Sequence, residues 1–529
     1  MKHIIQHAEG CISSQPIPSR EAETLGDYVR DWAAREPERP VLLAEGRRPM
    51  TYGELAELVD HYRLSINEAG LGRGDRVAVM HSGGAGMAAV CLGLIDAATI
   101  VPLNPKSTVD EIVEQLQRRG ARALVAESGH ESDAPAAAER LGLPVHWVEE
   151  SDGSVAAASR LRITSSAVAA RPGVTEAEDT ALILGTSGTS GKSKIVPISH
   201  RKLVAGSHAL IKFYTLTKDD RGLMLQPLYY SSGLNSIGYT TVSGASLVLM
   251  PEFDVERFFH LLVTQAPTWY GGSYTFQMQI EAHASRYADA IARSRLRLFR
   301  TMSGALDQNI ADSLAQKLGV PIYERYGSTE AGTVTGQPLP WTPRKPGTVG
   351  RAIDCEVAIA GPDGARLPAG ERGEILVKGP CVFDGYENDP ETNAEAFLDG
   401  WYRTGDEGFL DAEGYLTLTG RIKEMINRGG EKINPAEVDA ALMAIPGVRE
   451  AVCFPIPHPS LGEEVAAVVV TEPGAKLSVG DVRAGAAERI AGFKVPKQIV
   501  IAEVIPKNAT GKAQRYKLAE IYGVRTRAR

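Results

Sequence analysis

Short apolar runs rich in β-branched residues alternate with helical segments through the first half of the chain. Residues 76–80, 123–126 and 246–250 are such runs, and residues 109–119 form a helical segment between two of them. Strands that are separated by helices pair in parallel, so this alternation predicts an α/β fold with helices on both faces of parallel sheets. From about 347 to 418, short strands follow one another with close turns, which predicts a β-rich subdomain appended to the α/β body.

Length and charge indicate how the chain divides. With 529 residues it exceeds the roughly 250 to 300 residues that one hydrophobic core can organise. Residues 1–422 carry 41 basic and 53 acidic side chains, a net charge of -12, whereas residues 423–529 carry 16 and 12, a net charge of +4. We therefore expect a large N-terminal domain over 1–422 and a small, mobile α+β domain over 423–529, although a solvated charged face is the alternative explanation of the imbalance.

Composition excludes several classes of protein. The net charge of -8 argues against a broad electrostatic contact with nucleic acid or anionic lipid. The N-terminus lacks the apolar run of a signal peptide, and the most apolar stretch, 88–103, contains Asp96 and is too short to span a bilayer, so it predicts a buried helix followed by a strand. The five widely spaced cysteines form no disulfide or zinc pattern. We expect a cytoplasmic protein with neither nucleic acid nor membrane as its partner.

The strongest local signal is an apolar run that enters a loop crowded with glycine, hydroxyl groups and lysine. Residues 182–194 read Leu-Ile-Leu-Gly-Thr-Ser-Gly-Thr-Ser-Gly-Lys-Ser-Lys. Glycines let backbone N–H groups converge on an anion, hydroxyls donate further hydrogen bonds and lysines supply charge, so the loop predicts a polyphosphate site; a flexible loop is the alternative. The candidate phosphate-binding residues are Thr186, Ser187, Gly188, Thr189, Ser190, Gly191, Lys192 and Lys194.

Two families of phosphate loop compete for this segment. The P-loop pattern requires glycine, four residues, then glycine, lysine and Ser/Thr, and Thr186 stands where the first glycine is required. A P-loop ATPase or kinase that releases ADP is therefore the less favoured alternative. Residues 186–194 instead resemble the phosphate loop of the adenylate-forming superfamily, which includes acyl-CoA synthetases and luciferases. Ser193 stands where that family usually has proline.

A second segment, Tyr326-Gly327-Ser328-Thr329-Glu330, resembles the Tyr-Gly-x-Thr-Glu segment of the same superfamily. The resemblance implies that these five residues belong to the ATP site. Tyr326 would stack on adenine, Thr329 would bind the α-phosphate and Glu330 would hold Mg2+. The residue types suit these roles, because an aromatic face matches a purine and a carboxylate oxygen is a hard ligand for Mg2+.

The segments 402–406 and 420–437 also resemble family motifs. The first implies that Asp406 accepts hydrogen bonds from the ribose hydroxyls. The second implies that Arg421 contacts the ribose and that Lys423 is the hinge between the domains, which is where the charge changes sign; hinges are a few residues at element ends. Gly429 and Gly430 would lie beside the pantetheine passage, since glycine allows a close backbone approach.

Near the C-terminus, Pro506-Lys-Asn-Ala-Thr-Gly-Lys512 resembles the segment that carries the family's adenylation lysine, Lys512. The resemblance extends from about 22 to 517 and is nearest to small-acid or aryl-acid CoA ligases such as oxalate-CoA ligase. It implies an enzyme, an AMP-forming acid–thiol ligase, in which ATP and Mg2+ convert a small carboxylic acid to an acyl-adenylate that CoA then attacks. A freestanding enzyme that loads the phosphopantetheine of a carrier protein is the alternative, and an inactive nucleotide-binding protein is disfavoured because every motif position is filled.

Three segments resemble the acyl site of the family: 229–233, 271–273 and 302–305. Many CoA ligases have histidine where Tyr230 stands. Three roles are open for Tyr230: it gates the pocket, it forms a hydrogen bond to the acid, or it only fills space. No aspartate occurs between 229 and 232, which disfavours α-amino acids as substrates. The candidate acid-pocket residues are Tyr229, Tyr230, Gly233, Ser273, Ser303 and Ala305, and Gly304 is assigned to the nucleotide.

Overall fold

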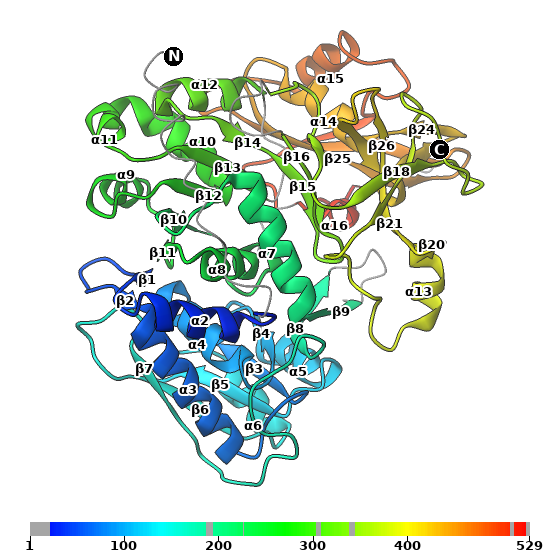
Figure 1. The fold of residues 1–529 in the computed structure, drawn as a ribbon. Helices are drawn as coiled ribbons and strands as arrows, with labels where there is room; N and C mark the ends of the chain where they lie inside the picture. The colour runs from blue at the N-terminus through cyan, green and yellow to red at the C-terminus, as the bar shows by residue number, and fades with distance from the viewer. Residues whose placement is uncertain are drawn as a thin grey trace.

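The computed structural model describes residues 22–186, 194–225, 227–302, 308–337, 344–507 and 513–524. Two α/β layers, a β-rich part and a small C-terminal unit follow one another along the chain, from the blue and cyan layer at the bottom of Figure 1 to the orange and red unit at its upper right. Mixed α/β architecture with parallel sheets and a smaller C-terminal domain is the predicted fold class, and the prediction is confirmed.

The first sheet has seven strands in the order β7-β6-β5-β3-β4-β8-β9. Its central strands pair in parallel, while β7 and β9 add antiparallel edges. Side chains alternate along β3, so that Val77 and Val79 face one buried cluster and Ala78 and Met80 face another. The strands are β3 (Arg76–Met80), β4 (Thr99–Pro102), β5 (Ala123–Glu127), β6 (Val145–Glu150), β7 (Ser159–Arg162), β8 (Thr180–Thr186) and β9 (Lys194–Ser199).

The second sheet also has seven strands, in the order β14-β13-β12-β10-β11-β1-β2, and it is parallel except at β2. Non-consecutive neighbours mean that helical crossovers connect the strands, as the alternating sequence predicts. The strands are β1 (Pro40–Leu43), β2 (Met50–Thr51), β10 (Arg221–Met224), β11 (Ser246–Leu249), β12 (Trp269–Ser273), β13 (Leu298–Met302) and β14 (Ile322–Tyr323).

Helices fill the space between the sheets and cover their outer faces. One buried cluster joins the inner faces of both sheets to α2 (Leu25–Arg35), α3 (Tyr52–Glu68), α4 (Gly84–Ile95), α7 (His200–Tyr214) and α8 (Ser231–Ser243). The outer face of the first sheet carries α5 (Val109–Arg118) and α6 (Ala134–Arg140). The outer face of the second carries α9 (Val255–Thr264), α10 (Tyr274–His283), α11 (Ala288–Ala292) and α12 (Gln308–Leu318). The helices therefore alternate with the two sheets in layers.

The predicted β-rich subdomain is present. A three-stranded sheet contains β15 (Arg325–Ser328), β16 (Gly332–Gly336) and β17 (Arg351–Ala352), and a five-stranded antiparallel sheet contains β18 (Glu356–Ala360), β19 (Gly373–Lys378), β20 (Phe397–Leu398), β21 (Trp401–Leu410) and β22 (Leu416–Arg421). The short helix α13 (Pro390–Ala396) precedes β20. The close turns expected here are closed by hydrogen bonds from Gly364 N to Gly361 O and from Gly414 N to Asp411 O, both 3.0 Å.

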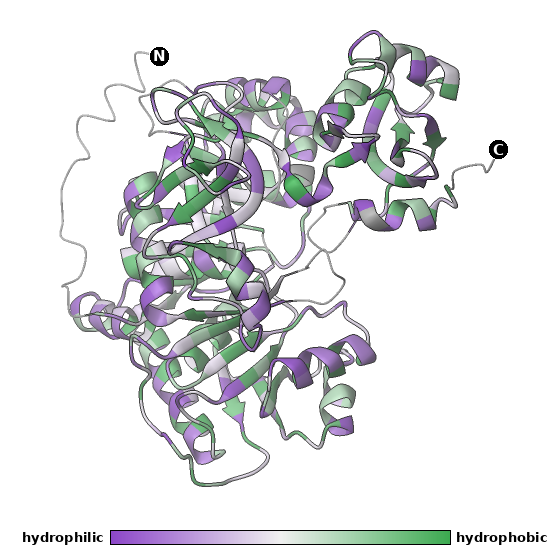
Figure 2. Ribbon diagram, turned by 90° about the vertical axis from the view of Figure 1, so that its right-hand side faces the viewer, coloured by the Kyte–Doolittle hydropathy of each residue, from purple (hydrophilic) through white to green (hydrophobic). Residues whose placement is uncertain are grey.

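The C-terminal part has its own two buried clusters, one on each face of a five-stranded sheet. It stands at the upper right of Figure 2, beside the larger body. A short 3-10 turn, η2 (Ile422–Glu424), leads into it. Its elements are β23 (Ile426–Arg428), β24 (Glu431–Ile433), α14 (Pro435–Met443), β25 (Val448–His458), β26 (Gly462–Thr471), α15 (Val479–Ala487), β27 (Gln498–Ile501) and α16 (Arg515–Ile521).

The most apolar stretch of the sequence forms the buried helix α4 followed by the buried strand β4, as predicted. The helix ends at Asp96, whose carboxylate lies 3.0 Å from Arg30 Nη1 and 3.5 Å from Arg63 Nε. Among the described residues no helix has both the length and the apolar character needed to cross a bilayer.

Candidate active site

The carboxyl ends of neighbouring parallel strands bring distant segments together. Strands β10, β12, β13 and β14 lie side by side in the second sheet and run in the same direction. Tyr229 to Gly233 follow β10, Ser273 closes β12, and Tyr326 follows β14. Ligands of open α/β sheets bind at this edge. Ser303, Gly304 and Ala305 follow β13 in the chain and lie outside the described residues.

Tyr326, Asp406 and Arg421 meet across three strands. The Tyr326 hydroxyl donates a hydrogen bond to Asp406 Oδ2 at 2.6 Å, and Arg421 Nε lies 3.6 Å from Asp406 Oδ1. Asp406 and Arg421 are paired in the register of β21 with β22, which fixes their spacing. Burial and the neighbouring carboxylate raise the pKa of Tyr326 well above its usual value, so the phenol stays protonated and remains a donor.

Glu330 lies at the centre of a second group of polar side chains. It is 9 % exposed, and its Oε1 accepts a hydrogen bond of 3.0 Å from the Tyr386 hydroxyl. The Tyr402 hydroxyl lies 3.5 Å from that of Tyr386, and Lys194 Nζ sits 4.4 Å from the centroid of the Tyr386 ring. One carboxylate, one ammonium group and two phenols thus converge beside the end of the phosphate loop.

Thr329 faces a small enclosed cavity. Its Oγ1 lies 3.3 Å from Ser231 Oγ, at the start of α8. The cavity has a volume of about 30 Å3 and is lined by these two residues together with Asn235, Cys381 and apolar side chains of β8 and α7. Since one water needs about 10 to 15 Å3 by this measure, the space holds about two waters behind the threonine.

Much of the predicted phosphate loop is not described. Thr186 ends β8 and Lys194 begins β9, and the two are paired across the hairpin. Ser187, Gly188, Thr189, Ser190, Gly191 and Lys192 lie outside the described residues, as does Lys512. The β8–β9 hairpin therefore holds the two ends of the predicted phosphate loop side by side.

The predicted hinge lies beside the same cluster. Lys423 occupies the 3-10 turn η2, directly after β22. Burial lowers the pKa of Lys194, and the charge of Lys423 lowers it further. The next residue, Glu424, lies with its Oε2 3.4 Å from Arg515 Nε, on α16 of the small domain. Arg515 also donates to Asp439 Oδ1 at 3.2 Å and to the Cys453 carbonyl at 2.5 Å.

Gly429 and Gly430 form the two-residue turn of the hairpin between β23 and β24. Their φ angles are +61° and +99°, a region that side chains disfavour. The turn itself therefore requires glycine at both positions. This reason differs from the close backbone approach that the sequence suggested.

Among the acid-pocket candidates, Tyr229 and Tyr230 pack against each other with ring centroids 4.6 Å apart. Both are half-buried, and burial raises the pKa of each phenol. Gly233 lies so close to the preceding turn that an added Cβ would come within 2.4 Å of Pro227 O. Glycine is therefore needed there for packing. Ser273 pairs with Met302 in the register of β12 with β13.

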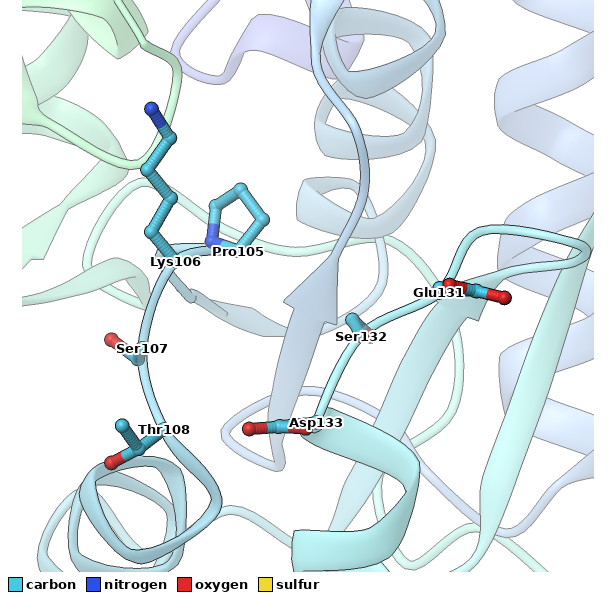
Figure 3. A pocket seen from close by; sticks show the side chains of 7 residues that line it. All are labelled: Pro105, Lys106, Ser107, Thr108, Glu131, Ser132 and Asp133. Carbon is cyan, nitrogen blue, oxygen red and sulfur yellow. The ribbon is translucent and has the colours of Figure 1, made fainter.

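A separate hollow opens at the carboxyl edge of the first sheet. It has a volume of about 490 Å3 and lies between the loop after β4, with Lys106 and Thr108, and the loop after β5, with Glu131 and Asp133 (Figure 3). Its lining mixes one lysine with two carboxylates. No residue predicted for the site lines it.

Tyr386 and Ser231 lie at the candidate site, although neither was among the individual residues predicted for it. Tyr386 bonds Glu330 across 56 positions and Ser231 reaches Thr329 across 98. Tyr386 stands in no segment that resembles a family motif, whereas Ser231 lies within 229–233, which resembles the acyl site, so its place there could have been inferred. Tyr402 does open the segment 402–406, so its place beside Glu330 could have been inferred from that motif.

Comparison with known proteins identifies the family. The model of the AMP-binding enzymes matches residues 29–387, and that of the AMP-binding enzyme C-terminal domain matches 437–512. The oxalate–CoA ligase of Arabidopsis thaliana is 33 % identical over 94 % of this chain and 99 % of its own. The sulfoacetate–CoA ligase of Cupriavidus necator is 32 % identical over 94 % and 97 %. The ATP-bound crystal structure of MatB from Rhodopseudomonas palustris is 29 % identical, covers 95 % of this chain and 99 % of its own, and has a TM-score of 0.85.

These matches span both the large and the small part of the chain and nearly the full length of each relative. The family model covers more than half of the chain, and both relatives are more than 30 % identical to it. These matches agree with the residues found together at the candidate site. The chain belongs to the AMP-binding enzymes and is an AMP-forming acid–thiol ligase.

Proposed function

We propose that the enzyme joins a small carboxylic acid to CoA in two steps, forming acyl-adenylate and pyrophosphate first and acyl-CoA and AMP second. The observation that carries the proposal is the convergence of Tyr326, Asp406 and Arg421 with Glu330 and Lys194 at one edge of the fold. The Asp406 carboxylate lies between the Tyr326 ring and the Arg421 guanidinium, an arrangement that suits a ribose beside a purine. The Lys194 ammonium group suits the phosphates.

The direct test is the identity of the nucleotide product. Incubation with ATP, Mg2+, CoA and a panel of small, aryl and fatty acids should release AMP and pyrophosphate in an acid-dependent manner. Release of ADP would instead support a P-loop ATPase or kinase. Exchange of labelled pyrophosphate into ATP in the absence of CoA should report the first step alone.

ATP and Mg2+ fit the residues present. Mg2+ is commonly held by one or two protein carboxylates together with substrate phosphates and water. Glu330 is a single carboxylate beside Thr329, and among the described residues no group of three or more His, Cys, Asp or Glu could hold a metal by itself. A metal bound here would therefore depend on the phosphates, and it would neutralise charge on the leaving pyrophosphate. Glu330 would orient it and Lys194 would add positive charge.

CoA is the proposed acceptor of the acyl group, because the curated relatives named above are CoA ligases. A carrier protein remains the alternative acceptor. Incubation of the acyl-adenylate with CoA and with separate phosphopantetheinylated carrier proteins, followed by mass measurement of the products, distinguishes the two. A thioester found only on a carrier would replace CoA in the proposal.

Asp406→Asn should weaken the use of ATP. Hydrogen bonds to a charged group contribute about 1.5 to 3 kcal/mol, so kcat/KM for ATP should fall about 10- to 100-fold. Tyr326→Phe keeps the aromatic ring and removes only the bond to Asp406, and it should cost less than Asp406→Asn. Steady-state AMP formation at varied ATP measures both. An unchanged KM for ATP in Asp406→Asn would refute the ribose role of Asp406.

We further propose that residues 1–422 and 423–529 move as two bodies about Lys423. The short turn η2 and the separate buried clusters on its C-terminal side support this division. After adenylate formation, rotation would withdraw Lys512 and bring the turn at Gly429 and Gly430 toward the thiol.

Lys423→Pro should separate the two half-reactions. Proline fixes φ near -65° and removes a backbone N–H, so it restricts the rotation. Adenylate formation should persist, whereas thioester formation should fall about 100-fold, as expected when reacting groups are misplaced. Lys423→Ala keeps the backbone free and is the matched control. Equal losses in both half-reactions would contradict the hinge.

A reducing compartment is the proposed location. Four cysteines lie in the described part of the chain, and all four are free thiols: Cys91, Cys355, Cys381 and Cys453. Burial raises the pKa of the Cys91 thiol to about 12, which keeps it unreactive. The cytoplasm meets this requirement.

A further inference from the structure

Arg300 is buried in the large domain, and no countercharge is paired with it in the described part of the chain. Arg300, on β13, is 1 % exposed. Its Nη2 donates to Ser236 Oγ at 2.9 Å and contacts Met224 Sδ at 3.6 Å, whereas its Nε and Nη1 have no hydrogen-bond partner among the residues that the structure describes. The guanidinium carbon lies 5.0 Å from the ring centroid of Trp269 and 5.1 Å from that of Tyr239. A buried charge with open donors is costly unless something compensates it.

The carboxylates on neighbouring elements are already paired with other arginines. Asp220, before β10, lies 2.8 Å from Arg297 Nε, and Glu324, after β14, is ion-paired with Arg344. No hydrogen bond or ion pair in the described chain joins Arg300 to a carboxylate. Aromatic faces offer a cation only part of what it loses on leaving water.

The surroundings of Arg300 are rich in hydrogen-bond donors. Trp269 Nε1 and the Tyr214 hydroxyl are buried, and neither has a hydrogen-bond partner among the described residues. Burial lowers the pKa of Arg325, on β15, whose Nη1 donates to Thr333 Oγ1. The Arg300 guanidinium and the unpartnered donors beside it form an environment that an anion would complete.

This donor cluster adjoins the predicted acid pocket. The guanidinium packs against Gly271, where an added Cβ would lie 2.5 Å from Arg300 Nε. Ser236, its hydrogen-bond partner, stands one turn after Ser232 on α8, and its hydroxyl donates to the Ser232 carbonyl at 2.9 Å. Both neighbours therefore belong to, or directly follow, segments that the acid should contact.

We propose that the acid activated by this enzyme carries a second anionic group, a carboxylate or a sulfonate, and that the Arg300 guanidinium binds it. The inference rests on the proposed function, because it concerns the acid that is adenylated. Arg300 is then a specificity-determining residue, and the first carboxylate is left free to attack ATP. A monocarboxylate of equal length would leave the cation without a partner, and sites built for a polar group reject analogues that lack it.

Matched pairs of acids test the proposal. Pyrophosphate release should be measured with malonate against propionate, and with succinate and sulfoacetate against butyrate. The wild-type enzyme should prefer at least one dianion over its matched monoanion by about 100-fold or more in kcat/KM. In Arg300→Met, a side chain that fills the space without charge, the ratio of the two specificity constants should fall by about 100-fold. A wild-type preference for monocarboxylates, or equal losses for both acids in the variant, would overturn the assignment.

A second variant guards against an effect on folding. Replacing a buried uncompensated charge by an apolar residue is often neutral or stabilising, so Arg300→Met should melt at or above the wild-type temperature. Should it fail to fold, Arg300→Lys keeps the charge and should keep the preference for the dianion at reduced affinity. Loss of the preference in a folded Arg300→Lys, or an undiminished affinity for the dianion in that variant, would contradict a direct ionic bond between the acid and the guanidinium.

Binding without turnover separates this inference from the proposed function. Malonate or sulfoacetate alone, without ATP, should raise the melting temperature of the wild-type protein, and the shift should vanish in Arg300→Met. An enzyme that forms AMP with monocarboxylates but ignores dianions would retain the proposed function and refute the role of Arg300. A protein that binds the dianion but never forms AMP would retain the role of Arg300 and refute the proposed function.

Discussion

Lys512→Ala should lower the rate of acyl-adenylate formation by about 100- to 1000-fold, the usual cost of one aligned donor to developing charge. The lysine lies outside the described residues, but the described residues that flank its segment pair with each other. Lys507 and Ala513 form a bridge, and Lys507 Nζ lies 2.8 Å from Glu450 Oε1. The reason for the loss is electrostatic, because charge builds on the phosphoryl oxygens as pyrophosphate leaves.

Pyrophosphate exchange measures this first step without CoA. Thioester formation from supplied acyl-adenylate provides the internal comparison and should change much less, since its charge develops at the acyl carbonyl. Lys507→Ala removes a nearby lysine of the same segment and is the matched control. Undiminished exchange in Lys512→Ala would refute the role assigned to the lysine.

Glu330→Gln should cost about 100-fold or more in kcat/KM and should raise the Mg2+ concentration needed for half-maximal activity. Glutamine retains an oxygen that can accept the Tyr386 hydroxyl, so the substitution removes charge with little change in packing. Activity at varied Mg2+, with ATP held constant, gives the measurement.

Tyr386→Phe is the control for Glu330→Gln. It removes the hydrogen bond and leaves the carboxylate, so it should lower activity far less and leave the Mg2+ requirement near that of the wild-type enzyme. If both variants lost the same activity with the same Mg2+ dependence, Glu330 would act through Tyr386 and not through the metal.

The sequence predicted layers and motifs better than it predicted contacts. Strand and helix periodicity placed α4, β4 and α5 to within a few residues, because those segments are long and strongly patterned. Tyr326 and Asp406 were each assigned to the nucleotide from their motifs. Their direct hydrogen bond joins positions 80 apart, and no local pattern encodes a contact that only the pairing of distant strands creates.

Two kinds of residue escaped prediction for different reasons. Tyr386 acts by its position beside Glu330, which depends on the fold of the whole β-rich part. Arg300 interrupts an apolar strand, and a single charge in such a run has no periodic signature in the sequence. Only the structure shows that its side chain is buried and that two of its nitrogens lack a partner among the described residues. Gly429 and Gly430 were assigned from a motif, yet the structural requirement for glycine is the positive φ of a hairpin turn.

The contacts of Arg515 have a mechanical consequence. Arg515 stands three positions after Lys512. Its side chain joins the turn at Glu424 to α14 through Asp439 and to β25 through the Cys453 carbonyl. Arg515 therefore links the turn that contains Lys423, the proposed hinge, to the core of the small domain. In a rotation about Lys423, these parts should move together as one rigid body. Withdrawal of Lys512 and arrival of the opposite face of the domain should then occur in a single movement.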